Sequence, residues 1–230
     1  MLGWALDLAS KLRNRADQVR LERRWARLRA LGMHIGEGVN LPASTWIDMS
    51  HCFLISIGDG CGFGPDCLIL AHDAQMDEFL DAARIGKVII HESCHIGART
   101  VILPGTEMGP RTIVGANSVV SKSLPADTVC AGNPAKVICS LEEYLARHRE
   151  QMATRRTFPY LQYAIEALTP EKQAEVIAAV VDGDAYITGG YSEELKGGGG
   201  TQRTERSPET AQRARELLNS RNARQDRPPR

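Results

Sequence analysis

Residues 90–120 read IHESCHIGARTVILPGTEMGPRTIVGANSVV, and a large apolar side chain returns at every sixth position of this stretch. These side chains belong to Ile90, Ile96, Ile102, Met108, Val114 and Val120. A helix repeats near 3.6 residues and a strand near 2, so neither accounts for a sustained period of six. Short straight edges joined by sharp corners do account for it. The spacing therefore predicts a chain wound around a three-sided prism, with three six-residue edges in each turn.

Small residues hold fixed places in the same repeat. Glycine follows the large side chain at Gly97, Gly109 and Gly115, where a tight corner favours a residue that tolerates strained backbone angles. A small side chain lies four positions after each of the first five large ones, at Cys94, Thr100, Thr106, Thr112 and Ser118. One large and one small inward side chain on each edge fill a narrow triangular interior. Coils stacked at the usual strand spacing of about 4.8 Å then form a parallel β-helix.

The same phase recurs earlier in the chain, in two shorter runs. Their sixfold positions are Ile35, Leu41 and Ile47, and then Ile57, Phe63 and Ile69. The alternative is an ordinary β-rich domain with chance spacing, but so many matching steps argue against it. We therefore predict a mainly β fold in which residues 34–139 form the β-helix.

Composition narrows the class of protein. The 230 residues include 28 basic and 28 acidic side chains, so charge gives no support for a nucleic-acid partner. The six cysteines have no closely paired spacing, and we expect them to be reduced and buried. No apolar stretch is long enough to cross a bilayer, and charged residues interrupt the leucines near the start. These features predict a cytoplasmic protein.

Both ends of the chain differ from the repeat. Residues 1–33 read as a basic amphipathic helix, interpreted either as a cap on the open edge of the first coil or as a peripheral contact with an anionic membrane. Residues 140–195 read as a small helical annex, in which Thr169, Pro170 and Glu171 form a helix start signal. Residues 196–230 have too few apolar side chains to pack, and we expect a flexible tail without a catalytic role.

The sixfold count fails between Ile69 and Ile90, where Leu70-Ala71-His72-Asp73 leaves the wall and residues 73–87 form a loop. Interruptions of a solenoid are places where function tends to be carried. The loop and the residues before it are therefore the first place to look for a site.

Two segments carry a resemblance to a known family: IGDGCGFGPDCLILAHDA at 57–74 and KVIIHESCHIGARTVILPGTEMGPRTIVGANSVVSKSLPADTVCAGNPAKVI at 87–138. They resemble the hexapeptide-repeat acyltransferases, which include sugar and xenobiotic O- and N-acetyltransferases. The resemblance spans roughly residues 35–138 and is most specific in IGA, ILPG, VGANSVV and AGNPAK. It implies a left-handed parallel β-helix, a homotrimer, and acetyl-CoA bound between neighbouring subunits. The annex is more loosely similar to members associated with bacterial surface-polysaccharide synthesis.

The resemblance implies a catalytic role for His72, which is similar in position to the family's catalytic histidine. The physical reason is independent, because a hydroxyl that attacks a thioester needs a base for its proton, and imidazole suits this task near neutral pH. Asp73 is a candidate to orient His72, or its carboxylate bonds corner amides instead. His51 lies on the preceding coil, about where the family lines its acceptor cleft, and is a candidate acceptor contact. A structural hydrogen bond is the alternative for His51.

Acetyl-CoA binding needs a smooth strip of wall and, at the nucleotide end, cations and hydroxyls. Small residues at Gly97, Ala98, Gly115 and Ala116 give such a strip, and the two alanines match family positions that contact the cofactor. Farther along, the family's positions near the nucleotide are matched by Ser121, Lys122 and Lys136. The alternatives are plain corner-making for the small residues and solvated surface charge for the lysines. The sequence departs from the family at His95, where an aromatic residue is common, and at Cys139, where a basic residue is common.

The leading hypothesis is direct acetyl transfer from acetyl-CoA to a hydroxyl or amine of a sugar, which is a nucleotide sugar or a polysaccharide precursor, with His72 as base, no acyl-enzyme and no metal. A metal site at His91 and His95 is not expected, because residues four apart share a face only on a helix. One competing function is a metal-dependent hydratase similar to the γ-class carbonic anhydrases, whose downstream histidine pair this sequence lacks. The other is a non-catalytic scaffold that binds a membrane or a partner through the basic helix and tail.

Overall fold

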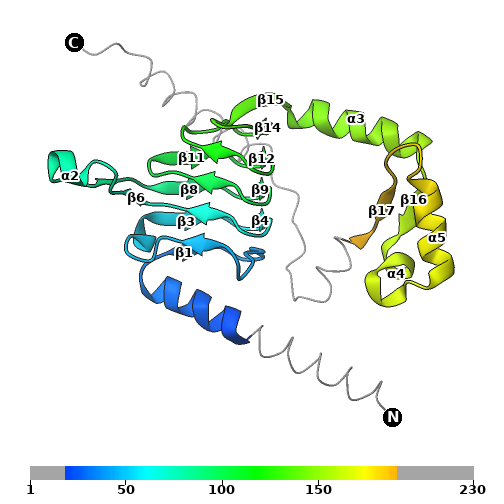
Figure 1. Ribbon diagram of the computed structural model, residues 1–230, viewed down its shortest axis with the longest axis horizontal. Coiled ribbons are helices and arrows are strands. Elements are labelled where there is room, and N and C mark those ends of the chain that lie inside the picture. Colours follow the sequence, from blue (N-terminus) through cyan, green and yellow to red (C-terminus); the bar gives the residue numbers. More distant parts are fainter. Residues whose placement is uncertain (1–18, 191–230) are drawn as a thin grey trace, which may run out of the picture. The chain divides into compact units, whose positions relative to one another are not determined.

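The computed structural model describes residues 19–190, and its β-rich part is a coil whose walls are three sheets (Figure 1). Sheet A contains, in spatial order, β1 (His34–Ile35), β3 (Ile55–Ile57), β8 (Val88–Ile90) and β11 (Thr106–Met108). Sheet C contains β2 (Trp46–Ile47), β5 (Leu68–Ile69), β10 (Val101–Ile102) and β13 (Val119–Val120). Sheet B contains β4 (Gly62–Phe63), β9 (His95–Ile96), β12 (Ile113–Val114), β14 (Thr128–Ala131) and β15 (Lys136–Ser140). Strand pairs in these sheets are parallel except β14–β15, so the fold is a parallel β-helix.

From β3 to β13 the strands of the coil visit the sheets in the order A, B, C and then return to A. Within sheet A Ile90 pairs with Met108, and Ile96 pairs with Val114 in sheet B, so each partner lies one eighteen-residue turn farther along. The sixfold side chains from Ile90 to Val120 are all 3% exposed or less. The predicted three-sided coil with inward-facing sixfold positions is confirmed.

Small polar side chains complete the interior. The Thr100 hydroxyl donates to the carbonyl of Gly97 at 2.8 Å, and the Thr112 hydroxyl donates to the carbonyls of Gly109 at 2.9 Å and Pro125 at 2.7 Å. A buried hydroxyl without a partner is costly, so these bonds to corner carbonyls allow threonine inside the prism. None of the six cysteines, which all lie within residues 19–190, forms a disulfide, and five of them are buried. Cys139 is only partly buried, contrary to the expectation, because it lies on β15 at the end of sheet B.

Two insertions leave the coil at the same corner, between sheets C and A. The first lies between β2 and β3 and contains a 3₁₀ turn, Cys52–Leu54. The second lies between β5 and β8, where β6 (His72–Asp73) and β7 (Arg84–Ile85) form an antiparallel pair around α2 (Asp77–Leu80) and project from the wall (Figure 1). The walls stay in register across both insertions, since β2 pairs with β5 and β3 pairs with β8.

The N-terminal segment is helical over residues 19–30 and contacts the first coil. Leu28 is fully buried, and Trp25 packs against the buried core. Arg24 donates to the carbonyl of Ala43 at 2.7 Å and to that of Thr45. The apolar side of this segment therefore lies on protein, while residues 1–18 of the predicted helix are outside the described residues. Among the described residues, no helix has the length and apolar character needed to cross a membrane.

A second compact unit begins at Glu142. It contains most of α3 (Leu141–Thr154), then α4 (Tyr160–Tyr163), a 3₁₀ turn (Ile165–Ala167) and α5 (Pro170–Ala179). The Thr169 hydroxyl caps α5 by accepting from the Lys172 amide at 3.4 Å. The annex also contains a parallel pair, β16 (Thr157–Pro159) and β17 (Tyr186–Thr188), which the sequence analysis did not predict. Three-residue strands are too short to show a period of two. The predicted tail, 196–230, is outside the described residues.

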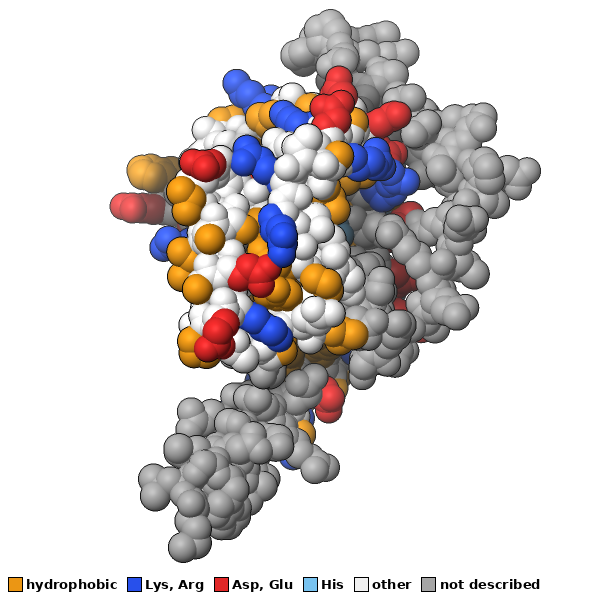
Figure 2. All heavy atoms as spheres, turned by 90° about the vertical axis from the view of Figure 1, so that its right-hand side faces the viewer, with side chains coloured by type: hydrophobic (Ala, Val, Ile, Leu, Met, Phe, Trp, Pro, Cys, Tyr) orange, Lys and Arg blue, Asp and Glu red, His pale blue; other side chains and the backbone are white. Residues whose placement is uncertain are grey.

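Hydrophobic side chains also reach the surface, where they occur among charged ones on the face shown in Figure 2. The outward positions of sheet C form an apolar row in which paired neighbours are Trp46, Leu68, Val101 and Val119. Trp46 is 51% exposed and Leu68 is 37% exposed. The outward positions of sheet A are more polar and comprise His34, Ser56, Ile89 and Glu107. Sheet C is therefore the more apolar of these two walls.

Candidate active site

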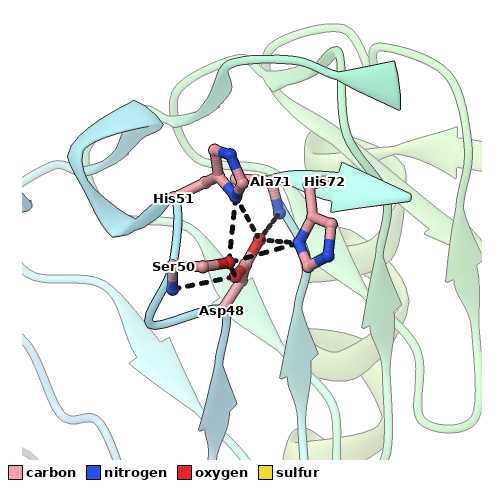
Figure 3. Close-up of polar contacts among 5 residues, drawn as sticks. All are labelled: Asp48, Ser50, His51, Ala71 and His72. Carbon is pink, nitrogen blue, oxygen red and sulfur yellow. Dashed lines mark hydrogen bonds and ion pairs between the residues drawn. The ribbon is translucent and has the colours of Figure 1, made fainter. Parts of the chain in front are cut away.

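A cluster of polar side chains lies at the corner where both insertions leave the coil (Figure 3). Asp48 directly follows β2, and Ser50 and His51 belong to the first insertion. His72 begins the second insertion as the first residue of β6. Because β2 pairs with β5, the residues that follow these strands emerge on neighbouring coils. The register of the wall thus brings together residues that are far apart in the sequence.

The Asp48 carboxylate is the centre of this cluster, and the residue is 1% exposed. Its Oδ1 accepts from the Ser50 amide at 3.1 Å and from the Ser50 hydroxyl at 2.5 Å. Its Oδ2 accepts from the Ala71 amide at 3.3 Å and lies 2.6 Å from Nδ1 of His72. Burial by itself raises the pKa of Asp48, but hydrogen bonds from Ser50 and His72, the charge of His72 and the Ala71 amide together lower the pKa to about 2. Asp48 is therefore a buried, fixed carboxylate.

His72 is held by one ring nitrogen and leaves the other open. Its Nδ1 faces Asp48, and its Nε2 is on the far side of the ring (Figure 3). An ionised carboxylate can only accept a hydrogen bond, so the proton of the neutral ring belongs on Nδ1 and the lone pair on Nε2. The side chain is 32% exposed. His72 is thus arranged as a general base whose Nε2 can take a proton from a bound molecule.

His51 joins the same cluster. Its Nδ1 lies 2.9 Å from the Ser50 hydroxyl and 3.8 Å from Oδ2 of Asp48. Its ring centroid is 4.9 Å from that of His72. The structure therefore places His51 beside the candidate base, where a residue that contacts the acceptor is expected.

The carboxylate that orients His72 comes from Asp48, and Asp73 has a different contact. Asp73 Oδ1 accepts from the Gln75 amide at 3.0 Å and holds the start of the loop. His72 and Asp73 are consecutive residues of β6, and consecutive side chains of a strand point to opposite sides. The sequence analysis missed Asp48 and Ser50. A usable signal was the position of Asp48 directly after the sixfold residue Ile47, where the regular count first fails.

The predicted cofactor strip lies at a different corner. Gly97 and Ala98 follow β9, and Gly115 and Ala116 follow β12, so all four lie between sheets B and C. A shallow groove of about 300 Å³ on sheet B is lined by residues that include Gly62, His95 and Gly97. His72 does not line this groove. The remaining predicted contacts are all exposed: Ser121, Lys122 and Lys136.

We expect Gly97→Ala to destabilise the coil by about 1–3 kcal/mol, the usual cost of overpacking. A Cβ at this position would lie 2.4 Å from the backbone nitrogen of Ala116 on the next coil, and backbone cannot move aside without shifting the wall. Urea unfolding measures the change. The matched control is Gly62→Ala, whose Cβ would meet the His95 ring at 2.9 Å, because a side chain can turn away. Equal stability of the two variants would show that Gly97 is not required for packing.

Comparison with known proteins agrees with the coil. The family described as "Bacterial transferase hexapeptide (six repeats)" matches residues 87–122. YvoF of Bacillus subtilis (strain 168), provisionally named an acetyltransferase, is 33% identical over 54% of this chain and 69% of its own length. WcaF of Escherichia coli (strain K12), provisionally named a colanic acid biosynthesis acetyltransferase, is 30% identical over 48% of this chain and 71% of its own.

Among solved structures, the hexapeptide-repeat acetyltransferase VCA0836 of Vibrio cholerae, complexed with acetyl coenzyme A, is similar with a TM-score of 0.41 and 23% identity. That similarity covers 57% of this chain and 88% of VCA0836. YvoF and WcaF are each at least 30% identical to this chain over more than two thirds of their own length, and this similarity shows the family. The chain therefore belongs to the hexapeptide-repeat acetyltransferases and is an acyltransferase.

Proposed function

We propose that the protein transfers an acetyl group from acetyl-CoA to a hydroxyl or amine of a sugar, with His72 as the general base. The observation that carries this proposal is the 2.6 Å contact between His72 Nδ1 and the buried Asp48 carboxylate. Among residues 19–190 Nε2 has no hydrogen-bond partner, and it lies at the corner where the loop begins. The name of WcaF, which assigns it to colanic acid biosynthesis, supports a polysaccharide precursor as the acceptor.

The chemistry is a direct transfer within a complex of enzyme, donor and acceptor. His72 Nε2 takes the proton of the acceptor hydroxyl as its oxygen attacks the thioester carbonyl. Asp48 stabilises the imidazolium that forms, since its Oδ2 lies against Nδ1. The tetrahedral intermediate then collapses, the C–S bond breaks, and the imidazolium returns the proton to the leaving sulfur of CoA. Ser50 donates its hydroxyl proton to Asp48, so we assign it to holding the carboxylate rather than to forming an acyl-enzyme.

We further propose that the active form is a homotrimer of left-handed coils, with each site shared by two subunits. His72 lies at the corner between sheets C and A, whereas Gly97 and Ala116 lie at the corner between sheets B and C. One chain thus presents the base and the smooth strip at different corners, and a neighbouring copy can bring the two together. The apolar row on sheet C supports this, because an exposed apolar wall is favourable when a partner covers it.

We expect Leu68→Glu to dissociate the trimer, because a charge in a buried subunit contact is strongly unfavourable. Leu68 is an outward residue of sheet C and is 37% exposed in the single chain. Light scattering coupled to gel filtration should report a trimer for the wild type and a monomer for the variant. The control is Ser56→Glu, the corresponding outward position on sheet A, which should remain a trimer. A monomeric wild type would contradict the shared site.

The activity is tested by measuring CoA release from acetyl-CoA with a panel of amino sugars, hydroxy sugars and nucleotide sugars. We expect release above the hydrolysis background with at least one saccharide, together with a product that is heavier by one acetyl group. Mass spectrometry of the intact protein after incubation with acetyl-CoA alone should show no stable acetylation. Acetylation of the protein that is passed on to the sugar would replace direct transfer with a two-step route.

A further inference from the structure

Asp48, His51 and His72 together offer the ligand types of a transition-metal site. One ligand atom from each residue lies within 4.8 Å of the other two. We propose that these three residues bind one divalent ion of the zinc class, and that the bound ion blocks the base. The blocking half of this inference rests on the proposed function, whereas the binding half does not.

The orientation of the Asp48 carboxylate favours a metal ion that is bound through Oδ2 alone. The Ser50 amide and hydroxyl both bond Oδ1 of Asp48, which turns Oδ2 toward the two imidazole rings. Hydrogen bonds that fix a ligating carboxylate in this way are typical of metal sites and raise affinity. Ser50 would thus act as the outer support of the ion.

The distances require only small adjustments. Oδ2 lies 2.6 Å from Nδ1 of His72 and 3.8 Å from Nδ1 of His51. With metal–ligand bonds near 2.0–2.1 Å, neighbouring ligand atoms of a tetrahedral site are about 3.3 Å apart. The first distance must lengthen and the second must shorten, each by about 0.5–0.7 Å. Both rings are partly exposed, at 32% and 29%, so they can turn by this amount and leave an open side for water.

The ligand set selects the ion. Two imidazole nitrogens and one carboxylate oxygen suit Zn²⁺, Co²⁺ and Ni²⁺. Mg²⁺ and Ca²⁺ prefer sites made of oxygen alone. The site is therefore expected to discriminate against Mg²⁺ even when Mg²⁺ is in large excess.

Metal binding and base catalysis require opposite protonation states of Nδ1 of His72. In the metal-free site Nδ1 of His72 carries the proton that it donates to Asp48. When Nδ1 binds an ion, the neutral ring carries its proton on Nε2 instead. Nε2 then donates rather than accepts, and it cannot take a proton from an acceptor hydroxyl. The ion is thus an inhibitor of acetyl transfer and not a requirement for it.

Binding is measured by equilibrium dialysis of the chelator-treated full chain against Zn²⁺, with Co²⁺ absorption as the spectroscopic probe. The experiment uses a Cys139→Ser background, because Cys139 is the one cysteine that is not buried. We expect one Zn²⁺ per chain and at least tenfold weaker binding after His51→Gln. The control is His91→Gln, since His91 is also partly exposed at 35% and contacts a carboxylate, Glu107, at 2.9 Å. The control should bind like the wild type, and circular dichroism verifies that both variants are folded.

The outcomes separate the two halves of the inference. Absence of stoichiometric Zn²⁺, or equal binding by His51→Gln and the wild type, would overturn the site. Binding that His51→Gln weakens supports the site even if no acetyl transfer is detected, in which case the proposed function fails alone. In an active enzyme, at least tenfold inhibition by Zn²⁺ that EDTA reverses and Mg²⁺ does not reproduce supports the blocking role. Full activity at saturating Zn²⁺ overturns that role.

Discussion

Replacing His72 with asparagine should lower the turnover number for acetyl transfer by about 10²- to 10⁴-fold, the range that general-base catalysis contributes. Asparagine can still bond Asp48 from the same position, but it has no group that accepts a proton near neutral pH. The proposed donor strip at Gly97 and Ala116 lies at a different corner from the imidazole, so the dissociation constant for CoA should change little. Steady-state kinetics with saturating acetyl-CoA, combined with calorimetric titration of CoA, separate the two quantities.

The matched control for this experiment is His51→Asn. His51 is exposed to a similar degree and belongs to the same cluster, but its Nδ1 is 3.8 Å from the carboxylate oxygen that lies 2.6 Å from His72. If His51 contacts the acceptor, its replacement should raise KM for the sugar more than it lowers the turnover number. If His51→Asn abolished turnover and His72→Asn did not, the two histidines would have to exchange roles.

Asp48→Asn is expected to lower the turnover number by about 10²- to 10⁴-fold, because the amide favours the tautomer of His72 that cannot accept a proton on Nε2. Four donors converge on this carboxylate, two from Ser50 and one each from Ala71 and His72. An amide has only one oxygen, so its NH₂ group must face a donor on one side. If the two Ser50 bonds persist, the NH₂ group faces His72, and the ring places its proton on Nε2.

The readout for Asp48 must distinguish positioning from a loss of stability. We expect KM for both substrates to change by less than about threefold while the turnover number falls. The comparison variant is Ser50→Ala, which removes one bond to Oδ1 but keeps the charge and the contact with His72. It should retain more activity than Asp48→Asn. An Asp48→Asn enzyme with wild-type turnover would mean that the carboxylate does not orient the base.

The repeat made most of the coil predictable from sequence. Each sixfold position meets the same physical requirement, which is a large side chain that fills the interior at a fixed place on an edge. This requirement recurs on successive coils. Ile90, Ile102 and Val120 could therefore be assigned to the core without a structure, and all three are buried. The handedness does not follow from the spacing, because both hands need the same period. It remains part of the proposal.

The candidate site was only half predictable for a related reason. His72 was proposed from the family resemblance at the place where the count fails, and its contact with Asp48 was missed because that contact depends on the register between coils. Asp73 was chosen through adjacency in sequence, whereas proximity across coils decides which groups meet. The pairing of Ile47 with Ile69 shows that residues just after these positions are neighbours in space. Applying that register to the sequence would have placed Asp48 and Ser50 near His72.

The two insertions share one corner, and the strands on either side return to register after each of them. Loop length at this corner is therefore uncoupled from the packing of the walls. If the proposed function holds, these loops can change the acceptor preference while the interior stays the same. We expect that transplanting the 73–87 segment between relatives changes acceptor preference and leaves thermal stability nearly unchanged.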